Sequence, residues 1–348
     1  MVSFRKLGLL PLVVTPVIGS PMQLERRNST DKAPRNKVII DNDYLAGQWD
    51  PYLLALNAGW EVLGLTTCTG NTWMPQQAKH ALAMLEYGNL SCIPVYTGAL
   101  YPLVSTYERF HSWEAVHGDL PWQGAFAPYN ATLEAEGWDP SGGSDPYRIV
   151  QAAFTEGFPT AAAQSSPGAV QFMIDQVHKY PGQVSIFAAG PMTNVALAIR
   201  TDPEFASLAK ELVIEGGKID VNLFQFNLLF DPEAAKIVLN ANFPRILVSG
   251  NVANSVFATD EWIDEVAADG TAAVSMVDPS IVLNSTTFFI DVDVAYASPN
   301  YGNVHAYQKA LAPPNLRNIT YVLQINETRF KNTLKSIYQK PITCADLS

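Results

Sequence analysis

From Lys37 onward, short apolar runs alternate with stretches of helical pattern, and this alternation restricts the fold of the 348-residue chain most strongly. The first run is KVIID, and later runs read EVLGLTT, CIPVYTG, QVSIFAAG, ELVIEGG and RILVSGN. Apolar strands that are separated by helices form parallel sheets with both faces covered. We therefore predict an α/β fold with an open, Rossmann-like, mostly parallel sheet, helices on both faces and a single domain over residues 37–342.

Residues 107–166 interrupt the alternation. They are rich in Gly, Pro, Ser and aromatic residues and are predicted to form a long loop with at most a short helix. Loops of this length are uncommon unless they cover a site or are disordered. We expect any ligand preference to depend on this segment.

The first 36 residues are predicted to be a secretory leader. Residues 1–19 combine a basic start, an apolar stretch and a small-residue pattern, as in a signal peptide, and residues 20–36 are polar. A buried first strand or helix is the alternative, but Pro11 and Pro16 disfavour it. We expect a secreted, extracellular glycoprotein, because N-x-[ST] sequons occur at Asn28, Asn89, Asn130, Asn284, Asn318 and Asn326.

Charge and cysteine content exclude several classes of partner and site. The net charge of −11 disfavours nucleic acids and anionic membranes, and no apolar run reaches the roughly 18 to 20 residues that span a bilayer. The three cysteines, Cys68, Cys92 and Cys344, allow at most one disulfide, and their spacing does not suggest a metal site. A homo-oligomer stays open.

The carboxylates after the first strand point to a bound cation. Asp41 ends the run KVIID, Asp43 lies two residues further on, and Asp50 follows closely. Two buried anions so close together repel each other and lose solvation, unless a cation compensates them. Carboxylates and carbonyls suit Ca²⁺, which would leave one carboxylate able to take a proton from bound water.

Other interpretations of these residues remain open. Asp50-Pro51 and Asp231-Pro232 have the form of a helix N-cap followed by proline, and Asp50 taken alone is better explained as a cap. His117 is by default an ordinary loop histidine. Four tryptophans could stack on an aromatic ligand or simply belong to the core: Trp49, Trp73, Trp113 and Trp122.

Four motifs, in the same order along residues 37–342, resemble those of the inosine–uridine-preferring nucleoside hydrolases. VIIDNDYLAGQWDPYLLAL is similar to the opening D-x-D-P-G-x-D-D strand of that family, and LGLTTCTGN to its Gly-Asn motif. FAAGPMTNVALAI resembles its G-P-L-T-N turn, and FQFNLLFDPEAAKIVL its E-F-N-x-x-x-D-P-E-A-A segment. The resemblance implies a parallel-sheet α/β fold, a tightly held Ca²⁺ and hydrolysis of the N-glycosidic bond of ribonucleosides to ribose and free base.

The resemblance also implies a set of metal ligands. Asp43 would be both the general base and a Ca²⁺ ligand, with Asp50 and the main-chain carbonyl of Ala189 as further ligands. Counting back from Asp278-Pro279 places Asp269 at the position of another ligand, with Asp264 as the fallback.

Further residues would contact the nucleoside. Asn227 would hydrogen-bond the ribose, with Asn71 nearby, and His117 lies in the loop where the family often has a base-side histidine. Gln225 replaces the family's glutamate beside the ribose. Asp41 is assigned a structural role.

The chain also departs from the family pattern. Two extra residues separate Asp43 from Asp50, and the stretch before Asp278 is much shorter than in the family, with Ala268 where a histidine is expected. Departure of the base would then depend on a basic purine nitrogen or on an acid such as Asp119. These departures leave an alternative function open: a catalytically impaired extracellular relative that binds a ribosyl ligand or has lost activity.

Overall fold

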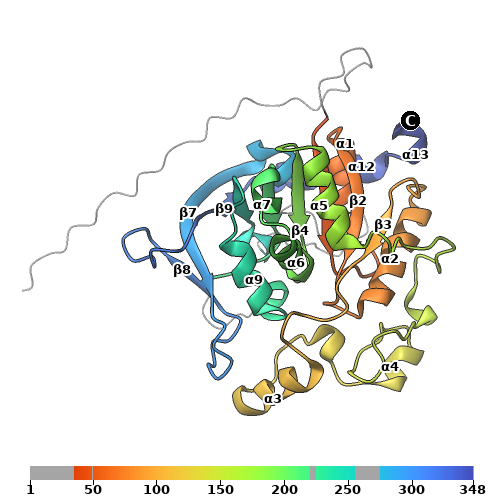
Figure 1. Ribbon diagram of the computed structural model, residues 1–348. Coiled ribbons are helices and arrows are strands. Elements are labelled where there is room, and N and C mark those ends of the chain that lie inside the picture. The colour runs from red at the N-terminus through yellow and green to blue at the C-terminus, as the bar shows by residue number, and fades with distance from the viewer. Residues whose placement is uncertain (1–34, 49, 220–224, 255–274, 348) are drawn as a thin grey trace, which may run out of the picture.

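The computed structural model describes residues 35–48, 50–219, 225–254 and 275–347 (Figure 1). The predicted signal peptide, most of the polar leader and Asn28 lie outside these residues. Within the described part the strands form one nine-stranded sheet in the order β3-β2-β1-β4-β5-β6-β9-β7-β8. The sheet and its helices form a single unit, as the alternating pattern predicted.

The strands from β3 to β9 pair in parallel, and two further strands extend the sheet in antiparallel fashion. The parallel strands are β1 (Lys37–Asn42), β2 (Glu61–Thr67), β3 (Val95–Thr97), β4 (Val184–Ala188), β5 (Glu211–Ile214), β6 (Ile246–Val248) and β9 (Asn318–Ile325). The antiparallel edge consists of β7 (Val282–Val292) and β8 (Val304–Tyr307). The prediction of an open, mostly parallel sheet is confirmed, although the sequence analysis did not predict β7, β8 and β9.

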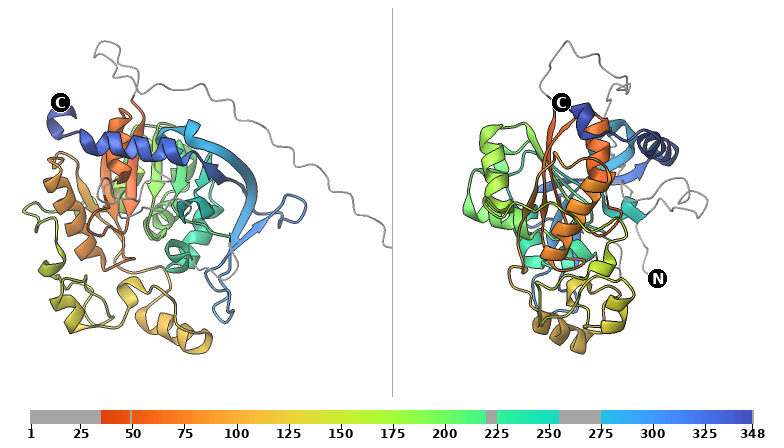
Figure 2. Two further views of the ribbon diagram at one scale, coloured as in Figure 1. Left: turned by 180° about the vertical axis from the view of Figure 1, so that it is seen from behind. Right: turned by 90° about the vertical axis from the view of Figure 1, so that its right-hand side faces the viewer.

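Helices cover both faces of the sheet (Figure 2). One apolar core lies under α1 (Asp50–Asn57), α2 (Met74–Tyr87) and α12 (Glu327–Gln339). The other lies under α5 (Ala169–Lys179), α6 (Thr193–Thr201), α7 (Phe205–Leu208) and α9 (Pro232–Leu239). Strand β1 shows why its run is continuously apolar, because Val38 and Ile40 enter the first core while Ile39 enters the second.

The segment between β3 and α5 folds into a small layer, here called the cap, beyond the carboxyl ends of the strands (Figure 1). It contains α3 (Tyr107–His117), α4 (Ala131–Ala135) and the 3-10 turns η1 (Gly124–Phe126) and η2 (Gln151–Ala153). The prediction of a long loop with at most a short helix understated this order. Helix α3 is capped by Thr106, whose hydroxyl accepts a hydrogen bond from the Arg109 amide, and its Phe110 packs against Phe126.

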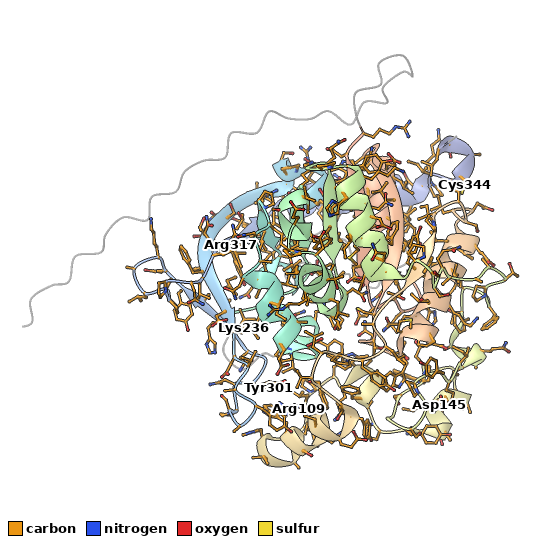
Figure 3. The ribbon with its side chains drawn as sticks, in the orientation of Figure 1. Arg109, Asp145, Lys236, Tyr301, Arg317 and Cys344 are labelled. Carbon is orange, nitrogen blue, oxygen red and sulfur yellow. A yellow bond between two sulfur atoms is a disulfide. The ribbon has the colours of Figure 1, made fainter. Side chains whose placement is uncertain are left out.

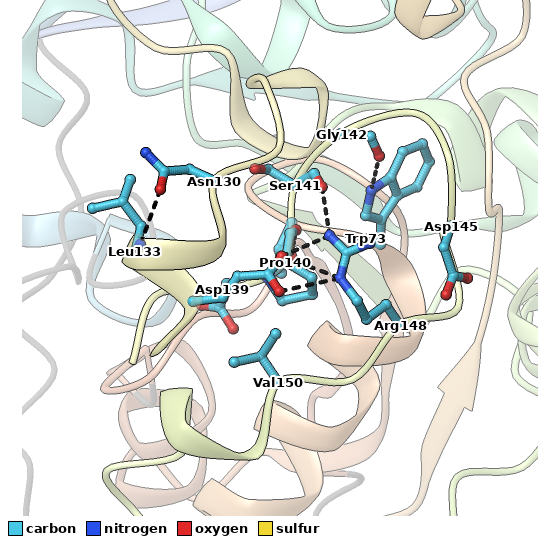
Figure 4. Close-up of polar contacts among 12 residues, drawn as sticks. Trp73, Asn130, Leu133, Asp139, Pro140, Ser141, Gly142, Asp145, Arg148 and Val150 are labelled. Atoms are coloured by element: carbon cyan, nitrogen blue, oxygen red, sulfur yellow. Dashed lines mark hydrogen bonds and ion pairs between the residues drawn. The ribbon is translucent and has the colours of Figure 1, made fainter. Parts of the chain in front are cut away.

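Hydrogen bonds fasten the cap to the start of α2. The Thr72 hydroxyl donates to the Pro140 carbonyl at 2.7 Å, and the Trp73 indole donates to the Gly142 carbonyl at 3.0 Å (Figure 4). Arg148 ties α4 to the same stretch, because its guanidinium contacts Glu134 at 2.6 Å and the Ser141 carbonyl at 2.7 Å. These bonds therefore hold the cap as a folded layer over the carboxyl ends of the strands.

The fold continues through α8 (Phe226–Leu229), the 3-10 turns η3 (Gly250–Asn254) and η4 (Pro279–Ile281), and α13 (Cys344–Leu347). A disulfide between Cys92 and Cys344 attaches α13 to the loop before β3, which settles the pairing that the sequence left open, and Cys68 is a buried free thiol. Among the described helices, none has the length and apolar character needed to cross a membrane.

Candidate active site

The register of the sheet brings the predicted polar residues together at the carboxyl ends of the parallel strands. This end of the sheet is called the edge below. Asp41 on β1 pairs with Thr66 on β2 and with Ala188 on β4, and Ala188 pairs in turn with Ile214 on β5. The residues that follow these positions therefore leave the sheet side by side, beneath the cap. Asp43, Asn71 and Ala189 all come from these strand ends.

Asp43 is the carboxylate at the centre of this edge. Asp43 is only 1% exposed, and its Oδ2 accepts a 2.8 Å hydrogen bond from the Asn71 main-chain amide. The Asn71 side chain donates back to the Asp43 carbonyl at 3.1 Å. The first bond fixes the carboxylate of Asp43, and the second fixes its main chain, against the loop that follows β2.

Two glycines let the backbone approach Asp43 closely. A Cβ atom on Gly70 would lie 2.2 Å from the Asp43 carboxylate, and one on Gly190 would lie 2.7 Å from the Asp43 amide nitrogen. No side chain fits at either distance. The glycines of the motifs LGLTTCTGN and FAAGPMTN are thus explained by the contact that each makes with Asp43.

Asp41 is fully buried and plays a structural part. Its Oδ1 accepts hydrogen bonds from the Thr66 hydroxyl at 2.6 Å and from the Asn194 side chain at 2.8 Å. Burial raises the pKa of Asp41 to about 6, although both bonds lower it. Asp41 thereby joins the end of β1 to β2 and to α6, which carries Asn194.

Asn227 lies on α8 and faces the ends of β4 and β5. Its amide nitrogen donates to the Ala189 carbonyl at 2.8 Å and to the Glu215 carbonyl at 3.0 Å. Gln225 caps α8, because its Oε1 accepts from the Leu228 amide at 3.0 Å. The Gln225 amide group also packs on Gly216, where a Cβ atom would come within 2.7 Å of it.

The cap contributes Trp122 to the edge. Its indole donates to Asn71 Oδ1 at 3.0 Å while the residue stays 44% exposed, whereas Trp73 and Trp113 are buried in the cap core. His117 ends α3 with its ring 4.8 Å from that of Trp113, and Asp119 is exposed nearby in the chain. The structure places both His117 and Asp119 in the cap.

Three predicted ligands fall where the structure gives no side chain. Asp50 begins α1, but its side chain lies outside the described part, and Asp264 and Asp269 belong to residues 255–274, which also lie outside it.

Asp231 is the N-cap of α9, as its Asp-Pro sequence predicted, and its Oδ1 accepts from the Ala234 amide at 3.2 Å. Burial raises the pKa of Asp231 to about 6.

The donor chemistry of the edge fits a hard cation. The Asp43 carboxylate and the Ala189 carbonyl are oxygen ligands, which Ca²⁺ prefers, and a carbonyl that accepts one bond from Asn227 keeps a second lone pair. Among the side chains that the structure describes, no three His, Cys, Asp or Glu residues gather as a metal cluster.

Glu215 is a further carboxylate at these strand ends, and no sequence motif pointed to it. It follows β5 directly, its amide donates to the Ala188 carbonyl at 2.9 Å, and its carbonyl accepts from Asn227. Its Oε1 accepts a 3.3 Å hydrogen bond from Ser249, which follows β6. The signal in the sequence was a carboxylate at the end of the apolar run LVI, directly before two glycines.

Comparison with known proteins gives a consistent result. The family model described as inosine-uridine preferring nucleoside hydrolase matches residues 38–332. The uncharacterized protein C800.11 of Schizosaccharomyces pombe is 29% identical over 326 residues, covering 80% of this chain and 78% of that protein. The probable uridine nucleosidase 1 of Oryza sativa is 31% identical over 244 residues, covering 68% and 65%.

Solved structures share the fold. A plant nucleoside hydrolase, the PpNRh1 enzyme, superposes with a TM-score of 0.65 at 22% identity, covering 88% of this chain and all of that one (100%). The purine-preferring ribonucleoside hydrolase from Gardnerella vaginalis gives a TM-score of 0.61 at 21% identity, covering 86% and 97%.

Proposed function

The chain belongs to the inosine-uridine preferring nucleoside hydrolase family, and on this premise we propose that it cleaves the N-glycosidic bond of ribonucleosides with Asp43 as the general base. The observation that carries the proposal is the held carboxylate of Asp43. One of its oxygens is bonded to the Asn71 amide, and the main chain at Gly70 and Gly190 approaches Asp43 too closely for a Cβ atom at either position. A carboxylate oriented in this way can accept a proton from a water molecule without reorganising.

The reaction follows from that position. Water bonds to C1′ of the ribose as the C1′–N bond breaks, through an oxocarbenium-like transition state. Asp43 takes the proton that the water loses, and the departing base gains one proton. His117 and Asp119 in the cap are the candidates to supply that proton, and a basic purine nitrogen takes it most readily.

Asp43 and the Ala189 carbonyl would hold a Ca²⁺ ion, with Asp50 and Asp269 as the further ligands of the proposed set. A bound Ca²⁺ supplies positive charge that stabilises anionic oxygens and lowers the pKa of water.

The ribose contacts are assigned to Asn227, Gln225 and Asn71. The amide nitrogen of Asn227 is committed to two main-chain carbonyls, so its oxygen faces the other way and can accept a bond from a ribose hydroxyl. Asn71 is hydrogen-bonded to both Asp43 and Trp122, and thus connects the proposed general base to the cap.

We also propose that the protein is secreted and glycosylated. The disulfide between Cys92 and Cys344 suits an oxidising compartment. Four sequon asparagines are exposed, namely Asn89, Asn130, Asn284 and Asn318, and a fifth, Asn326, is half-buried at the start of α12.

A second candidate function is binding of a ribosyl ligand without turnover. Gln225 favours it, because an amide that caps α8 replaces the carboxylate that the family has beside the ribose. Such a protein would keep the ribose contacts of Asn227 but would not cleave the N-glycosidic bond.

Ribose release from inosine, uridine, adenosine and guanosine, with Ca²⁺ and then with EDTA, separates these functions. We expect release that depends on Ca²⁺ and that Asp43→Ala abolishes. Folded wild-type protein that binds nucleosides and releases no ribose would establish the second function instead.

A further inference from the structure

Residues 118–123, here called the Trp122 loop, connect α3 to the 3-10 turn η1 and contact one of the residues that hold Asp43. The Trp122 indole donates to Asn71 Oδ1 at 3.0 Å. The main-chain amide of Asn71 in turn donates to Asp43 Oδ2 at 2.8 Å. Asn71 therefore lies between the proposed general base and the Trp122 loop.

The turn η1, which follows the loop, contacts a second neighbour of Asp43. The Ala125 amide donates to the Gly70 carbonyl at 2.8 Å, and the approach is so close that a Cβ atom on Gly124 would overlap that carbonyl oxygen. Gly70 itself packs against the Asp43 carboxylate, since a Cβ atom on Gly70 would overlap Oδ2. A shift of the loop and of this turn would therefore reach Asp43 through two adjacent residues.

One buried carboxylate holds the Trp122 loop from the cap side. Glu114 lies on α3 and is only 3% exposed. Its Oε1 accepts from the Leu120 amide at 2.8 Å, and both of its oxygens lie 2.8 Å from Gln123 Nε2. Its Oε2 also lies 2.9 Å from His111 Nδ1 on the same helix. Glu114 therefore holds the loop at two positions, one on each side of Trp122.

The loop has little apolar packing of its own. Within residues 118–123, all of which the structure describes, Leu120 is the one buried residue. Hydrogen bonds to a charged acceptor are roughly twice as strong as those between neutral groups. Because so little of the loop is buried, its place depends on the bonds to Glu114 more than on packing.

We propose that Glu114 is a positioning residue for the hydrolysis, which holds the Trp122 loop so that Asn71 stays bonded to the carboxylate of Asp43. This inference rests on the proposed function of Asp43 as the general base. Glu114 acts through Asn71 and without contacting the substrate. Its loss should therefore lower kcat more than it raises KM, because the ribose contacts assigned to α8 stay in place.

The variant Glu114→Gln tests this role. The new side chain can still accept from the Leu120 amide. Gln123 Nε2 contacts both oxygens of Glu114, however, so the new NH2 group meets this donor and weakens the bond. We expect kcat for ribose release to fall roughly 10- to 100-fold, since a 1 Å displacement of a catalytic group can cost about 100-fold. KM should stay within about threefold of wild type.

Two changes at Gln123 complete the test. The double variant Glu114→Gln, Gln123→Glu exchanges acceptor and donor, and kcat should rise at least about threefold over that of Glu114→Gln. Gln123→Met removes the bond from the loop side while Leu120 and His111 keep Glu114 bonded, so it should lower kcat even if Glu114→Gln does not fold. If the exchange recovers no activity, the route through Gln123 is wrong.

The matched control is Glu86→Gln on α2. The Glu86 carboxylate also accepts from main-chain amides of the cap, those of Thr160 at 2.9 Å and Ala161 at 2.7 Å, but at a place beside Cys344. This variant should leave kcat within about twofold of wild type. An equal loss in Glu86→Gln and Glu114→Gln would show that any loosening of the cap lowers activity, and would overturn the proposal.

Hydrogen–deuterium exchange, measured by mass spectrometry, tests the bond to Asp43 without turnover. A peptide that contains Asn71 should exchange at least about 10-fold faster in Glu114→Gln than in wild type, and at the wild-type rate in Glu86→Gln. If wild type releases no ribose, the hydrolase function fails, and this measurement still tests Glu114. Unchanged exchange at Asn71 would refute the positioning role. Thermal unfolding checks that each variant is folded.

Discussion

Gly70 and Gly190 bring main chain against Asp43 from two sides, so the position of its carboxylate depends on these two glycines. Such close approach requires glycine, since a single Cβ atom would overlap atoms of Asp43. The carboxylate is thus positioned by backbone, which moves less than side chains do. A site built in this way should be sensitive to very small substitutions.

Gly70→Ala tests this sensitivity. The new Cβ atom would lie 2.2 Å from Asp43 Oδ2 and 2.7 Å from Pro191, so Asp43 must move and lose its bond to the Asn71 amide. We expect ribose release to fall at least about 100-fold, the effect of a 1 Å displacement in a catalytic group. The control is Gly88→Ala at the end of α2, where φ is −81° and the tightest contact is 3.3 Å. Equal activity of Gly70→Ala and wild type would contradict the role of Asp43.

At the level of elements, a buried histidine attaches the cap to α2. His80 is fully buried and places its two ring nitrogens 2.6 Å from Glu156 and 2.8 Å from Asp139, both of which belong to the cap segment. Burial lowers the pKa of His80, but the hydrogen bonds and charges of the two carboxylates outweigh it and raise the pKa to about 9. His80 is therefore a cation that joins two points of the cap.

This arrangement predicts a loss of stability at alkaline pH. The folded-state pKa of His80 is above its ordinary value of 6.5, so its contribution is complete below pH 6.5 and is lost as pH rises through about 9. We expect the free energy of unfolding to fall by about 3 kcal/mol between these pH values. Urea unfolding from pH 6 to 10 measures it.

His80→Gln should flatten that pH dependence. His178→Gln is the control, because His178 pairs with Asp202 at the surface and its loss should leave the alkaline decrease in place. A wild-type stability that stays constant from pH 6 to 10 would show that His80 is not charged in the folded protein.

A second feature of the elements is the contact between α3 and the connection from β7 to β8. Its Arg109 guanidinium stacks 3.7 Å from the ring centroid of Tyr296, and Tyr301 lies beside it and donates to Glu233 on α9 (Figure 3). The connection between β7 and β8, which carries both tyrosines, thereby supports the cap from the antiparallel side of the sheet.

For the whole molecule, the disulfide joins parts that are 252 residues apart in the sequence. It closes a loop that contains the strands from β3 to β9, but not β1 and β2, and restricts the unfolded chain strongly. The double variant Cys92→Ser, Cys344→Ser should lower the free energy of unfolding by roughly 2 to 5 kcal/mol.

Chemical unfolding with and without dithiothreitol checks this prediction. The reductant should bring wild type to the stability of the double variant and leave the double variant unchanged. If dithiothreitol destabilises both proteins equally, the effect does not come from this disulfide.

Much of the architecture followed from local pattern. Continuous apolar runs between helices predicted a mostly parallel sheet with two covered faces, and four ordered motifs indicated the family; the fold and the family are both confirmed. Both predictions rest on features that a local sequence carries, namely hydrophobic periodicity and the residue types at strand ends. The strand ends also explain why Asp43, Asn71 and Ala189 meet.

Other features needed the tertiary structure, because they depend on contacts between residues far apart in the chain. The order of the cap comes from Phe110 against Phe126 and from His80 between two acids, which no local pattern reveals. The position of Glu215 depends on β5 lying beside β4. The sequence by itself determined the mostly parallel part of the sheet, the family and the place of Asp43 at a strand end, because local pattern carries these. The packing of distant segments decided the antiparallel strands β7 and β8, the cap, the disulfide and the position of Glu215.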